Sequence, residues 1–164
     1  MKLLIALALY LLYWFCCFLA TGTNQRNLMG LRSYPDFVQE AVRAHPVLGK
    51  KAPKEKSILS ILLGNLILFT AVFALLGAVL RDVLCLQGFW PAFWYFLALG
   101  EGLELFDLVV IDLIWWRNTK RIRFSFLPDK ALYQDPRKHI GSFLRGIPLF
   151  GAAAGLAAAM VALL

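Results

Sequence analysis

Residues 58–80 read ILSILLGNLILFTAVFALLGAVL and contain no charged side chain. A helix of about 20 predominantly apolar residues crosses a bilayer core of about 30 Å, so this stretch predicts a transmembrane helix. Three further apolar stretches lie at 3–20, 89–116 and 140–164. With N-caps and first-turn prolines taken into account, we expect four transmembrane helices at about 3–20, 58–80, 91–116 and 137–163.

The composition agrees with an all-α polytopic membrane protein. Hydrophobic residues make up 60% of the 164-residue chain and charged residues 16%, whereas soluble domains have roughly 45–50% and 25%. The apolar stretches leave no room for a separate soluble domain of ordinary size. We therefore expect one domain over residues 1–164, a four-helix transmembrane bundle. The first stretch could also be a cleaved signal peptide, but its length and its aromatic residues favour a retained helix.

The basic residues predict the orientation in the membrane. Residues 21–56 and 117–139 each hold seven Lys and Arg residues, whereas the loop after the second stretch holds only Arg81. Basic loops stay in the cytoplasm, so we expect cytoplasmic loops at 21–57 and 117–136 and both termini outside. This is the pattern of a multi-pass protein of the bacterial inner membrane. The net charge of +7 is then explained by topology and by contact with membrane lipids, and it does not indicate nucleic-acid binding.

The first loop contains a short amphipathic pattern. Pro35 and Asp36 are typical of a helix start, and Pro46 ends the pattern. One face between them is apolar and consists of Phe37, Val38, Ala41 and Val42. We expect a short helix that lies at the membrane interface.

Four acidic residues in the third apolar stretch are the most informative feature of the chain. They are Glu101, Glu104, Asp107 and Asp112, and no basic residue lies between them. At 100° per residue, three of them fall within about 80° of arc and Asp107 lies at the edge of that face. Because acids within a membrane span are costly, we expect this face to point into the bundle.

Two sets of polar residues follow from depth in the membrane. Asn65, Asp107, Asp112 and Arg145 are expected to form a polar layer in the cytoplasmic half, with His139 near its mouth. This layer is either a structural ion pair or part of a gate. We expect Glu101 and Glu104 near the midplane, a depth at which the sequence offers no basic residue. They suggest a binding site for a proton, a cation or a cationic small molecule, or alternatively two protonated carboxyls with a structural role.

The alternative function is a membrane-embedded enzyme that acts on a lipophilic substrate. Its anionic cofactor or headgroup would be held by Arg117, Lys120, Arg121, Arg123 and His139, although the positive-inside rule also explains these loop charges. Neither a cofactor nor a metal is indicated, because no ligand spacing, phosphate loop or hydrolase motif is present. Gly151, Gly155 and Ala159 form a small-residue row that suits helix packing, either within the chain or in a homo-oligomer. An accessory subunit that assembles through this row is a third option.

Two resemblances accompany these patterns. Residues 106–116 read FDLVVIDLIWW, and the basic run, His139 and Arg145-Gly146 follow. This order resembles a pattern in an uncharacterised family of small bacterial four-span membrane proteins, over about the last third of the chain. In size, span number and outside termini the chain is also similar to the MAPEG superfamily of membrane enzymes. Its Asn-x-x-Glu signature is not retained, since Leu68 follows Asn65 where glutamate would stand. This likeness is architectural and implies no activity.

Overall fold

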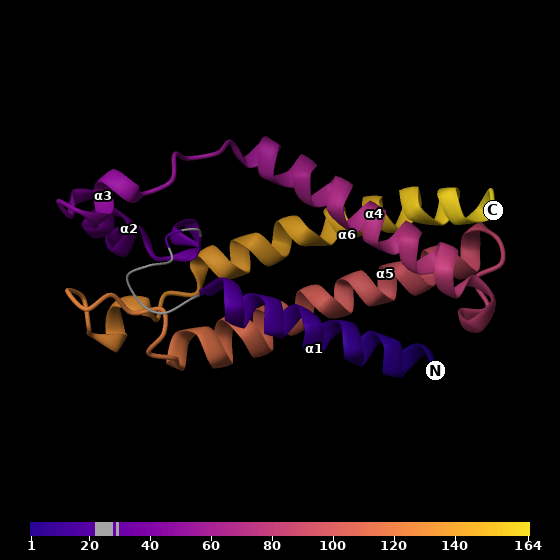
Figure 1. Ribbon diagram of the computed structural model, residues 1–164, viewed down its shortest axis with the longest axis horizontal. Coiled ribbons are helices and arrows are strands. Elements are labelled where there is room, and N and C mark those ends of the chain that lie inside the picture. Colours follow the sequence, from indigo (N-terminus) through magenta and orange to yellow (C-terminus); the bar gives the residue numbers. More distant parts are fainter. Residues whose placement is uncertain (22–27, 29) are drawn as a thin grey trace. The chain divides into compact units, whose positions relative to one another are not determined.

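The computed structural model describes residues 1–21, 28 and 30–164, and every regular element in this part of the chain is helical (Figure 1). The expected first loop lies partly outside the described residues, at 22–27 and 29. The long helices are α1 (Lys2–Thr21), α4 (Ile58–Leu84), α5 (Phe89–Phe106) and α6 (Arg137–Ala162). The short elements are η2 (Leu31–Ser33), α2 (Asp36–Ala44), α3 (Leu48–Lys51) and η4 (Lys130–Tyr133). The element η3 (Asp107–Trp116) is a π-helix that follows α5 without a break.

Three helical stretches are long and apolar enough to cross a membrane. They are Lys2–Thr21, Ile58–Leu84 and Lys130–Ala162, the last of which contains α6. The third expected span, 91–116, is instead divided between α5 and η3. The described chain is thus an all-α protein with three helices of membrane-spanning length and composition.

The helix ends follow from local chemistry. The Ser57 hydroxyl accepts a hydrogen bond from the Ser60 amide at 3.1 Å at the start of α4, and the Asp135 carboxylate accepts one from the Arg137 amide at 3.0 Å at the start of α6. Such side-chain caps satisfy amides that have no partner within the helix. At the other end of α4, Cys85 adopts the left-handed conformation with φ 52°, which is a common helix terminator. Helix α4 therefore extends four residues beyond its expected end.

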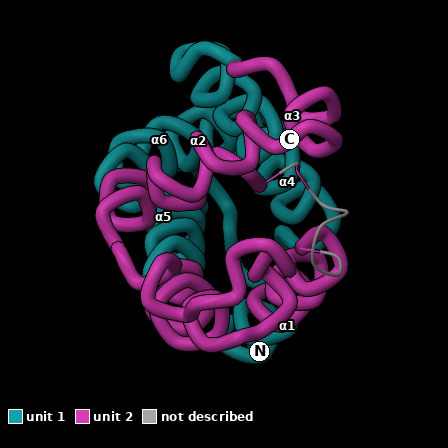
Figure 2. Tube along the Cα trace, turned by 90° about the vertical axis from the view of Figure 1, so that its left-hand side faces the viewer, with its two compact units in different colours: residues 1–9, 56–105, 143–164 teal, residues 10–55, 106–142 magenta. Residues whose placement is uncertain are grey.

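The chain divides into two compact units where the sequence predicts one domain (Figure 2). Unit 1 consists of residues 1–9, 56–105 and 143–164, and unit 2 of residues 10–55 and 106–142. Unit 1 holds most of the long apolar helices, whereas unit 2 holds the two basic segments together with the adjoining helix ends. The second unit arises because these segments carry their own apolar cluster.

Unit 1 is held together by aromatic rings and close helix contacts. The rings of Phe73 and Phe96 stack with centroids 5.4 Å apart and an interplanar angle of 3°, and the ring of Phe150 lies 4.5 Å from that of Phe69. A Cβ atom added at Gly100 would lie 2.6 Å from the Phe150 ring. Glycine at this position thus lets α5 approach α6 closely, as small residues do in membrane helices.

The buried face of α6 does not include the predicted small-residue row of Gly151, Gly155 and Ala159. Its fully buried residues are Ala153, Ala154, Ala157, Ala158 and Val161. By contrast, Cβ atoms added at Gly151 or Gly155 would meet no atom within 4 Å, and Ala159 is exposed. The packing of α6 within unit 1 therefore does not use the predicted row, and a role for that row in a homo-oligomer stays a prediction.

Unit 2 is built around an apolar cluster that joins residues of the loops at 21–57 and 117–136. Its buried members are Leu28, Leu31, Tyr34, Val38, Val42, Leu48, Trp116, Ile122, Phe124 and Tyr133. Val38 and Val42 belong to α2, so the amphipathic helix expected from the sequence exists. Its apolar face, however, packs onto this cluster, while Phe37 beside it is 59% exposed. The amphipathic pattern here reflects protein packing, and contact of α2 with lipid stays a prediction.

Buried tyrosines reinforce the cluster through hydrogen bonds. The Tyr34 hydroxyl donates to the Ile122 carbonyl at 2.8 Å. The Tyr133 hydroxyl donates to the Leu127 carbonyl at 2.8 Å and accepts from the Phe124 amide at 3.0 Å. These bonds satisfy polar groups that the cluster removes from water, and such groups are costly to leave unpaired. These hydrogen bonds hold residues 122–127, in the loop at 117–136, against Tyr34 and Tyr133.

We expect unit 2 to lose stability at alkaline pH through Tyr34. Burial, and secondarily the nearby Tyr133, raise the pKa of Tyr34 above its ordinary value of 10.0. The unfolded chain therefore releases this proton at lower pH than the folded chain, so the stability contributed by Tyr34 is present below about pH 10 and is lost as the pH rises further. Melting temperatures measured between about pH 9 and about pH 12 should fall less steeply for Tyr34→Phe than for wild type. Equal slopes would contradict this assignment.

Candidate functional site

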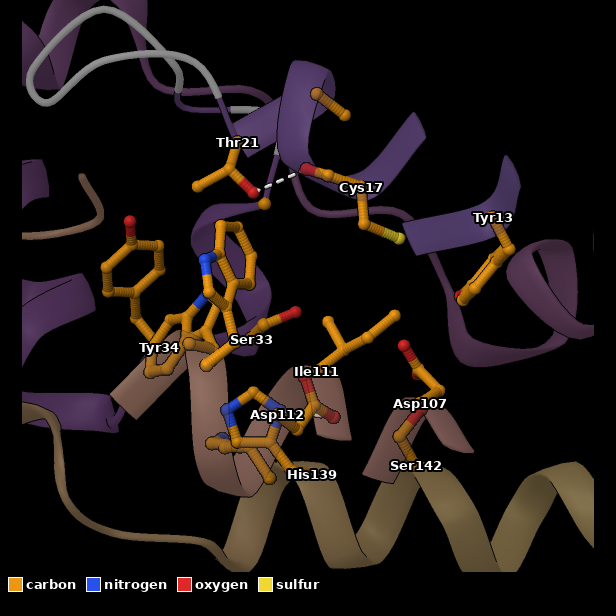
Figure 3. Close-up of a pocket in the computed structure, with 15 residues that line it drawn as sticks. Tyr13, Cys17, Thr21, Ser33, Tyr34, Asp107, Ile111, Asp112, His139 and Ser142 are labelled. Atoms are coloured by element: carbon orange, nitrogen blue, oxygen red, sulfur yellow. Dashed lines mark hydrogen bonds and ion pairs between the residues drawn. The ribbon is translucent and has the colours of Figure 1, made fainter. Parts of the chain in front are cut away.

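Unit 2 contains a cavity of about 370 Å³ between the end of α1, the η3 segment and the start of α6 (Figure 3). Its walls combine aromatic rings with ionisable side chains. The aromatic lining residues are Tyr13, Tyr34, Trp115 and Trp116, and the charged or titratable ones include Asp107, Asp112, Lys138 and His139. A cavity of this size and mixed lining is typical of small-molecule sites.

The π-helix brings two aspartates to the cavity. In an α-helix, residues five positions apart point about 140° away from each other. In η3 the hydrogen bonds run from residue i to residue i+5, which widens the turn and brings Asp107 and Asp112 toward one side of the helix, where both line the cavity. The face predicted for an unbroken α-helix grouped Asp112 with Glu101 and Glu104 and left Asp107 at its edge. That grouping fails beyond residue 106 because the helical period changes there.

Asp112 is paired with His139, which projects from the start of α6 (Figure 3). The distance from His139 Nδ1 to Asp112 Oδ2 is 2.7 Å, and the two side chains are 4% and 16% exposed. The ring of Trp116 meets the imidazole edge-on with centroids 4.8 Å apart. Because Nδ1 is used by the carboxylate, the orientation of the imidazole and its preferred tautomer are set.

The other imidazole nitrogen has no hydrogen-bond partner in the part of the chain that the structure describes. His139 Nε2 is buried and makes no hydrogen bond to any residue that the structure describes. Buried polar atoms are paired in the large majority of cases, so an unpaired one calls for an explanation. When Nδ1 carries the proton that bonds to Asp112, Nε2 of a neutral imidazole is a lone-pair acceptor. The site therefore contains an oriented imidazole whose second nitrogen has no hydrogen-bond partner among the described residues.

Asp107 lies on another part of the cavity wall, beside the end of α1. Its carboxylate is half-buried, and it lines the cavity together with Tyr13. The α1 residues are held against η3 by aromatic contacts, among them Trp14 against Trp115 with ring centroids 6.3 Å apart. Tyr13 carries no positive charge, so it does not compensate a charge on Asp107.

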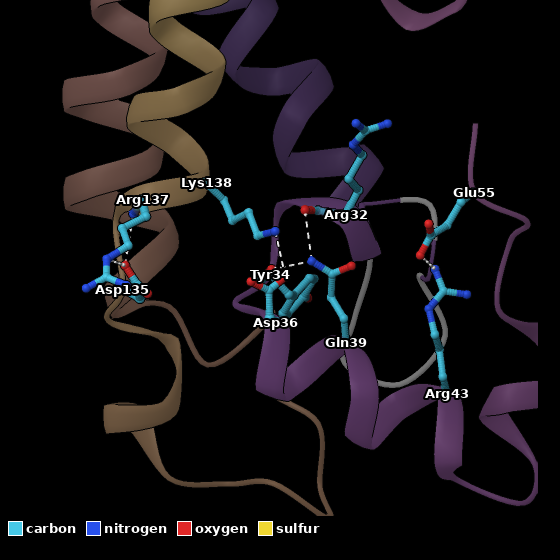
Figure 4. Close-up of polar contacts among 9 residues, drawn as sticks. All are labelled: Arg32, Tyr34, Asp36, Gln39, Arg43, Glu55, Asp135, Arg137 and Lys138. Carbon is cyan, nitrogen blue, oxygen red and sulfur yellow. Dashed lines mark hydrogen bonds and ion pairs between the residues drawn. The ribbon is translucent and has the colours of Figure 1, made fainter. Parts of the chain in front are cut away.

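Lys138 also lines the cavity, but its charge is compensated from outside. Its ammonium lies 2.6 Å from the Asp36 carboxylate at the start of α2 (Figure 4). The side chain of Gln39 donates to the Tyr34 carbonyl at 2.7 Å and holds that end of α2 in place. The lysine thus links α6 to α2 and adds little positive charge to the cavity.

The three arginines expected to hold an anion donate to backbone carbonyls of the chain itself. Arg117 donates to the Gln134 carbonyl at 2.6 Å, and Arg123 donates to the Asn118 carbonyl at 3.2 Å. Arg121 donates to the Phe18 carbonyl at 3.2 Å and stacks over the Phe18 ring at 4.0 Å. Lys120 is exposed. His139, which was grouped with them, is instead the partner of Asp112.

Four other predicted site residues belong to unit 1. Glu101 and Glu104 lie in α5 and are partly buried, and the Glu104 carboxylate packs directly against Gly146. Asn65 in α4 and Arg145 in α6 are exposed. The expected polar layer of Asn65 and Arg145 with the two aspartates is thus divided between the units, and their association stays a prediction.

Sequence reasoning missed the aromatic half of the site. Tyr34 reads as part of a loop, and Tyr13 reads as one more apolar residue of the first helix. Trp115 and Trp116 read as interfacial anchors at the end of the third apolar stretch. The sequence marks His139 and Asp112 as candidate site residues. It does not predict that they pair, because the pairing depends on contact between distant segments. Within the described residues, no group of three or more His, Cys, Asp or Glu side chains is placed to hold a metal ion.

Comparison with protein-family models, with curated proteins and with solved structures finds no match for this sequence.

Proposed function

We propose that this chain is a four-span membrane protein that binds a cationic small molecule in the cavity of unit 2. The observation that carries the proposal is the Asp107 carboxylate, which lines an aromatic cavity and has no cationic partner among the described ion pairs. A carboxylate that is partly removed from water favours a counter-ion. A ligand cation can supply it.

The aromatic walls add a second source of affinity. Tyr13, Tyr34, Trp115 and Trp116 surround the same space. Aromatic faces attract cations through the ring quadrupole, and clusters of them recognise alkylammonium groups. The Lys138 ammonium pairs with Asp36, and the Asp112 carboxylate contacts the His139 imidazole. The acidic group and the aromatic walls together favour a ligand with a positive charge and an apolar body.

The fourth span in this proposal consists of α5 together with η3, residues 89–116. Trp90 and Trp94 near its beginning are 63% and 60% exposed, and Trp115 and Trp116 stand at its end. Tryptophans at both ends are typical of a helix that crosses a membrane. Acidic residues within such a span are expected where they face a cavity, as Asp107 and Asp112 do.

The test is binding of benzylammonium to protein in lipid nanodiscs, measured by calorimetry. Asp107→Asn keeps the size of the side chain but removes the charge, and we expect it to weaken binding at least tenfold, since a charge-assisted contact contributes about 1.5–3 kcal/mol. Glu101→Gln is the matched control, because it removes the acid that sequence analysis favoured. If Glu101→Gln abolishes binding and Asp107→Asn does not, the ligand site lies in unit 1 and the proposal is wrong.

A second candidate function is acid–base catalysis on a lipophilic substrate, which the Asp112–His139 pair favours. A carboxylate that orients an imidazole is the arrangement by which many enzymes prepare a general base. The version with an anionic cofactor receives less support, because Arg117, Arg121 and Arg123 donate to backbone carbonyls of the chain itself. Turnover that is lost in His139→Gln, with amine binding retained, would favour this candidate.

A further inference from the structure

We propose that α3 and its neighbouring residues in unit 2 form a surface that docks on anionic phospholipid headgroups of the bilayer into which α4 inserts. This surface, which we term the α3 surface, consists of Val47, Lys50, Lys51, Lys54 and Phe126. The inference does not depend on the cavity or on its ligand. It also goes beyond the positive-inside rule, which places basic residues in a loop but requires neither an apolar contact nor anionic lipid.

The apolar part of the α3 surface is exposed and held in place. Val47 is 56% exposed and Phe126 is 36% exposed, and both contact His45. The His45 and Phe126 ring centroids are 4.6 Å apart, and the Val47 amide donates to His45 Nδ1 at 3.3 Å. The next residue, Leu48, is buried in the apolar cluster. It anchors α3 to unit 2 while Val47 stays exposed.

The basic part of the α3 surface has no anionic partner within the described chain. Lys50, Lys51 and Lys54 are exposed, and none of them belongs to an ion pair among the described residues. The acid of the same segment, Glu55, pairs with Arg43 at 3.0 Å instead (Figure 4). Three positive charges within five positions are therefore available to an external anion.

The place of these lysines in the chain favours a bilayer as the partner. Helix α4 begins at Ile58, four residues after Lys54, and is long and apolar enough to cross a membrane. The connecting residues 52–57 have no regular structure and can extend over at most about 20 Å. The tether keeps the α3 surface near the headgroups at a high effective concentration.

The combination of lysines and apolar side chains favours anionic lipid in particular. Interfacial binding grows with the apolar area that is buried and with attraction to anionic headgroups. Each lysine near an anionic membrane strengthens binding about fivefold. A zwitterionic bilayer offers the apolar part a partner but leaves the three ammonium groups without a counter-charge. The α3 surface should therefore leave water to a greater extent when the bilayer contains phosphatidylglycerol.

The experiment places a bimane fluorophore at Val47→Cys in full-length protein whose three native cysteines are replaced by alanine. The protein is reconstituted in nanodiscs of phosphatidylcholine, with and without phosphatidylglycerol, and all lipids carry brominated acyl chains that quench a probe at the bilayer surface. We expect quenching to be at least about twofold stronger with phosphatidylglycerol, and this difference should shrink in high salt. A probe at Phe126→Cys should respond in the same way.

Two controls separate docking on lipid from a general change in unit 2. A probe at Glu40→Cys, an exposed position of α2 outside the α3 surface, should show no dependence on phosphatidylglycerol. The variant Lys50→Gln/Lys51→Gln/Lys54→Gln removes the charges and keeps long polar side chains. Because these residues are exposed, its melting temperature should match wild type, while the effect of phosphatidylglycerol on the Val47 probe disappears.

A measurement without a fluorophore tests the same surface. Native mass spectrometry of unlabelled protein should show more retained phosphatidylglycerol for wild type than for the triple lysine variant. The inference is overturned if quenching is equal at Val47 and Glu40, or if phosphatidylglycerol has the same effect without the three lysines. A Val47 probe that stays in water in every nanodisc also overturns it, and an acidic protein is then the remaining candidate for this surface. Amine binding in the cavity is measured separately and is unaffected by these results.

Discussion

Val38→Asp is expected to unfold unit 2, with a loss of about 4–5 kcal/mol or more in the free energy of unfolding. Val38 is fully buried in the apolar cluster. A carboxylate there would have to lose its water without gaining a partner, which is among the costliest changes that a core tolerates. Tyr34 and Trp116 belong to the cluster and also line the cavity, so amine binding should disappear with the fold of the unit.

Phe37→Asp is the matched control for this change. Phe37 is the preceding residue of α2 and is 59% exposed, so the same new charge stays in water and lies near the helix N-terminus, where it is favourable. We expect its stability to stay within about 0.5 kcal/mol of wild type. Cleavage by trypsin within residues 30–55, followed by mass spectrometry, reports opening of unit 2. Equal rates for the two variants would show that α2 does not pack on the cluster.

Gly77→Leu is expected to destabilise unit 1 by about 3 kcal/mol or more. A Cβ atom at Gly77 would overlap the side chain of Val161 and lie 2.9 Å from the Phe96 ring. Neither neighbour can move easily, because both are fully buried and Phe96 is stacked on Phe73. The larger side chain must therefore separate α4 from α5 and α6.

Gly64 offers the control on the same helix. A Cβ atom at Gly64 would meet nothing within 4 Å, so Gly64→Ala should stabilise α4 by about 0.5–1 kcal/mol through helix propensity, whereas Gly77→Ala should destabilise it. The opposite signs are the decisive result. Thermal unfolding in detergent, followed by circular dichroism, measures both. If Gly77→Ala and Gly64→Ala shift the melting temperature in the same direction, the close contact at Gly77 does not exist in solution.

The positions of the long helices could be predicted because they depend on properties of contiguous residues. Apolar stretches of sufficient length place α1, α4 and α6 within four residues of their observed ends. The charge distribution likewise predicts an orientation, which stays a prediction. The amphipathic pattern of α2 predicts a helix correctly, but hydropathy does not distinguish a lipid surface from a protein surface as its partner.

The candidate site depended on changes of period and on contacts between distant segments. The sequence marks the four acids of the third apolar stretch as important. The face that it predicts for them, however, assumes the α-helical rotation of 100° per residue. The π-helical hydrogen bonding of η3 replaces that face with one that contains Asp107 and Asp112. No residue type in this stretch signals the change, because both helical forms accept the same apolar side chains.

Hydropathy and caps alone place the long helices in this chain, because each such helix satisfies its backbone polar groups with neighbours along the chain. The partner of each polar side chain is decided differently. His139 pairs with Asp112, Lys138 pairs with Asp36, and the Tyr34 hydroxyl donates a hydrogen bond to the Ile122 carbonyl. These contacts join segments that only tertiary packing brings together. The cavity belongs to this second group, since it exists only where the end of α1, η3 and the start of α6 meet around one space.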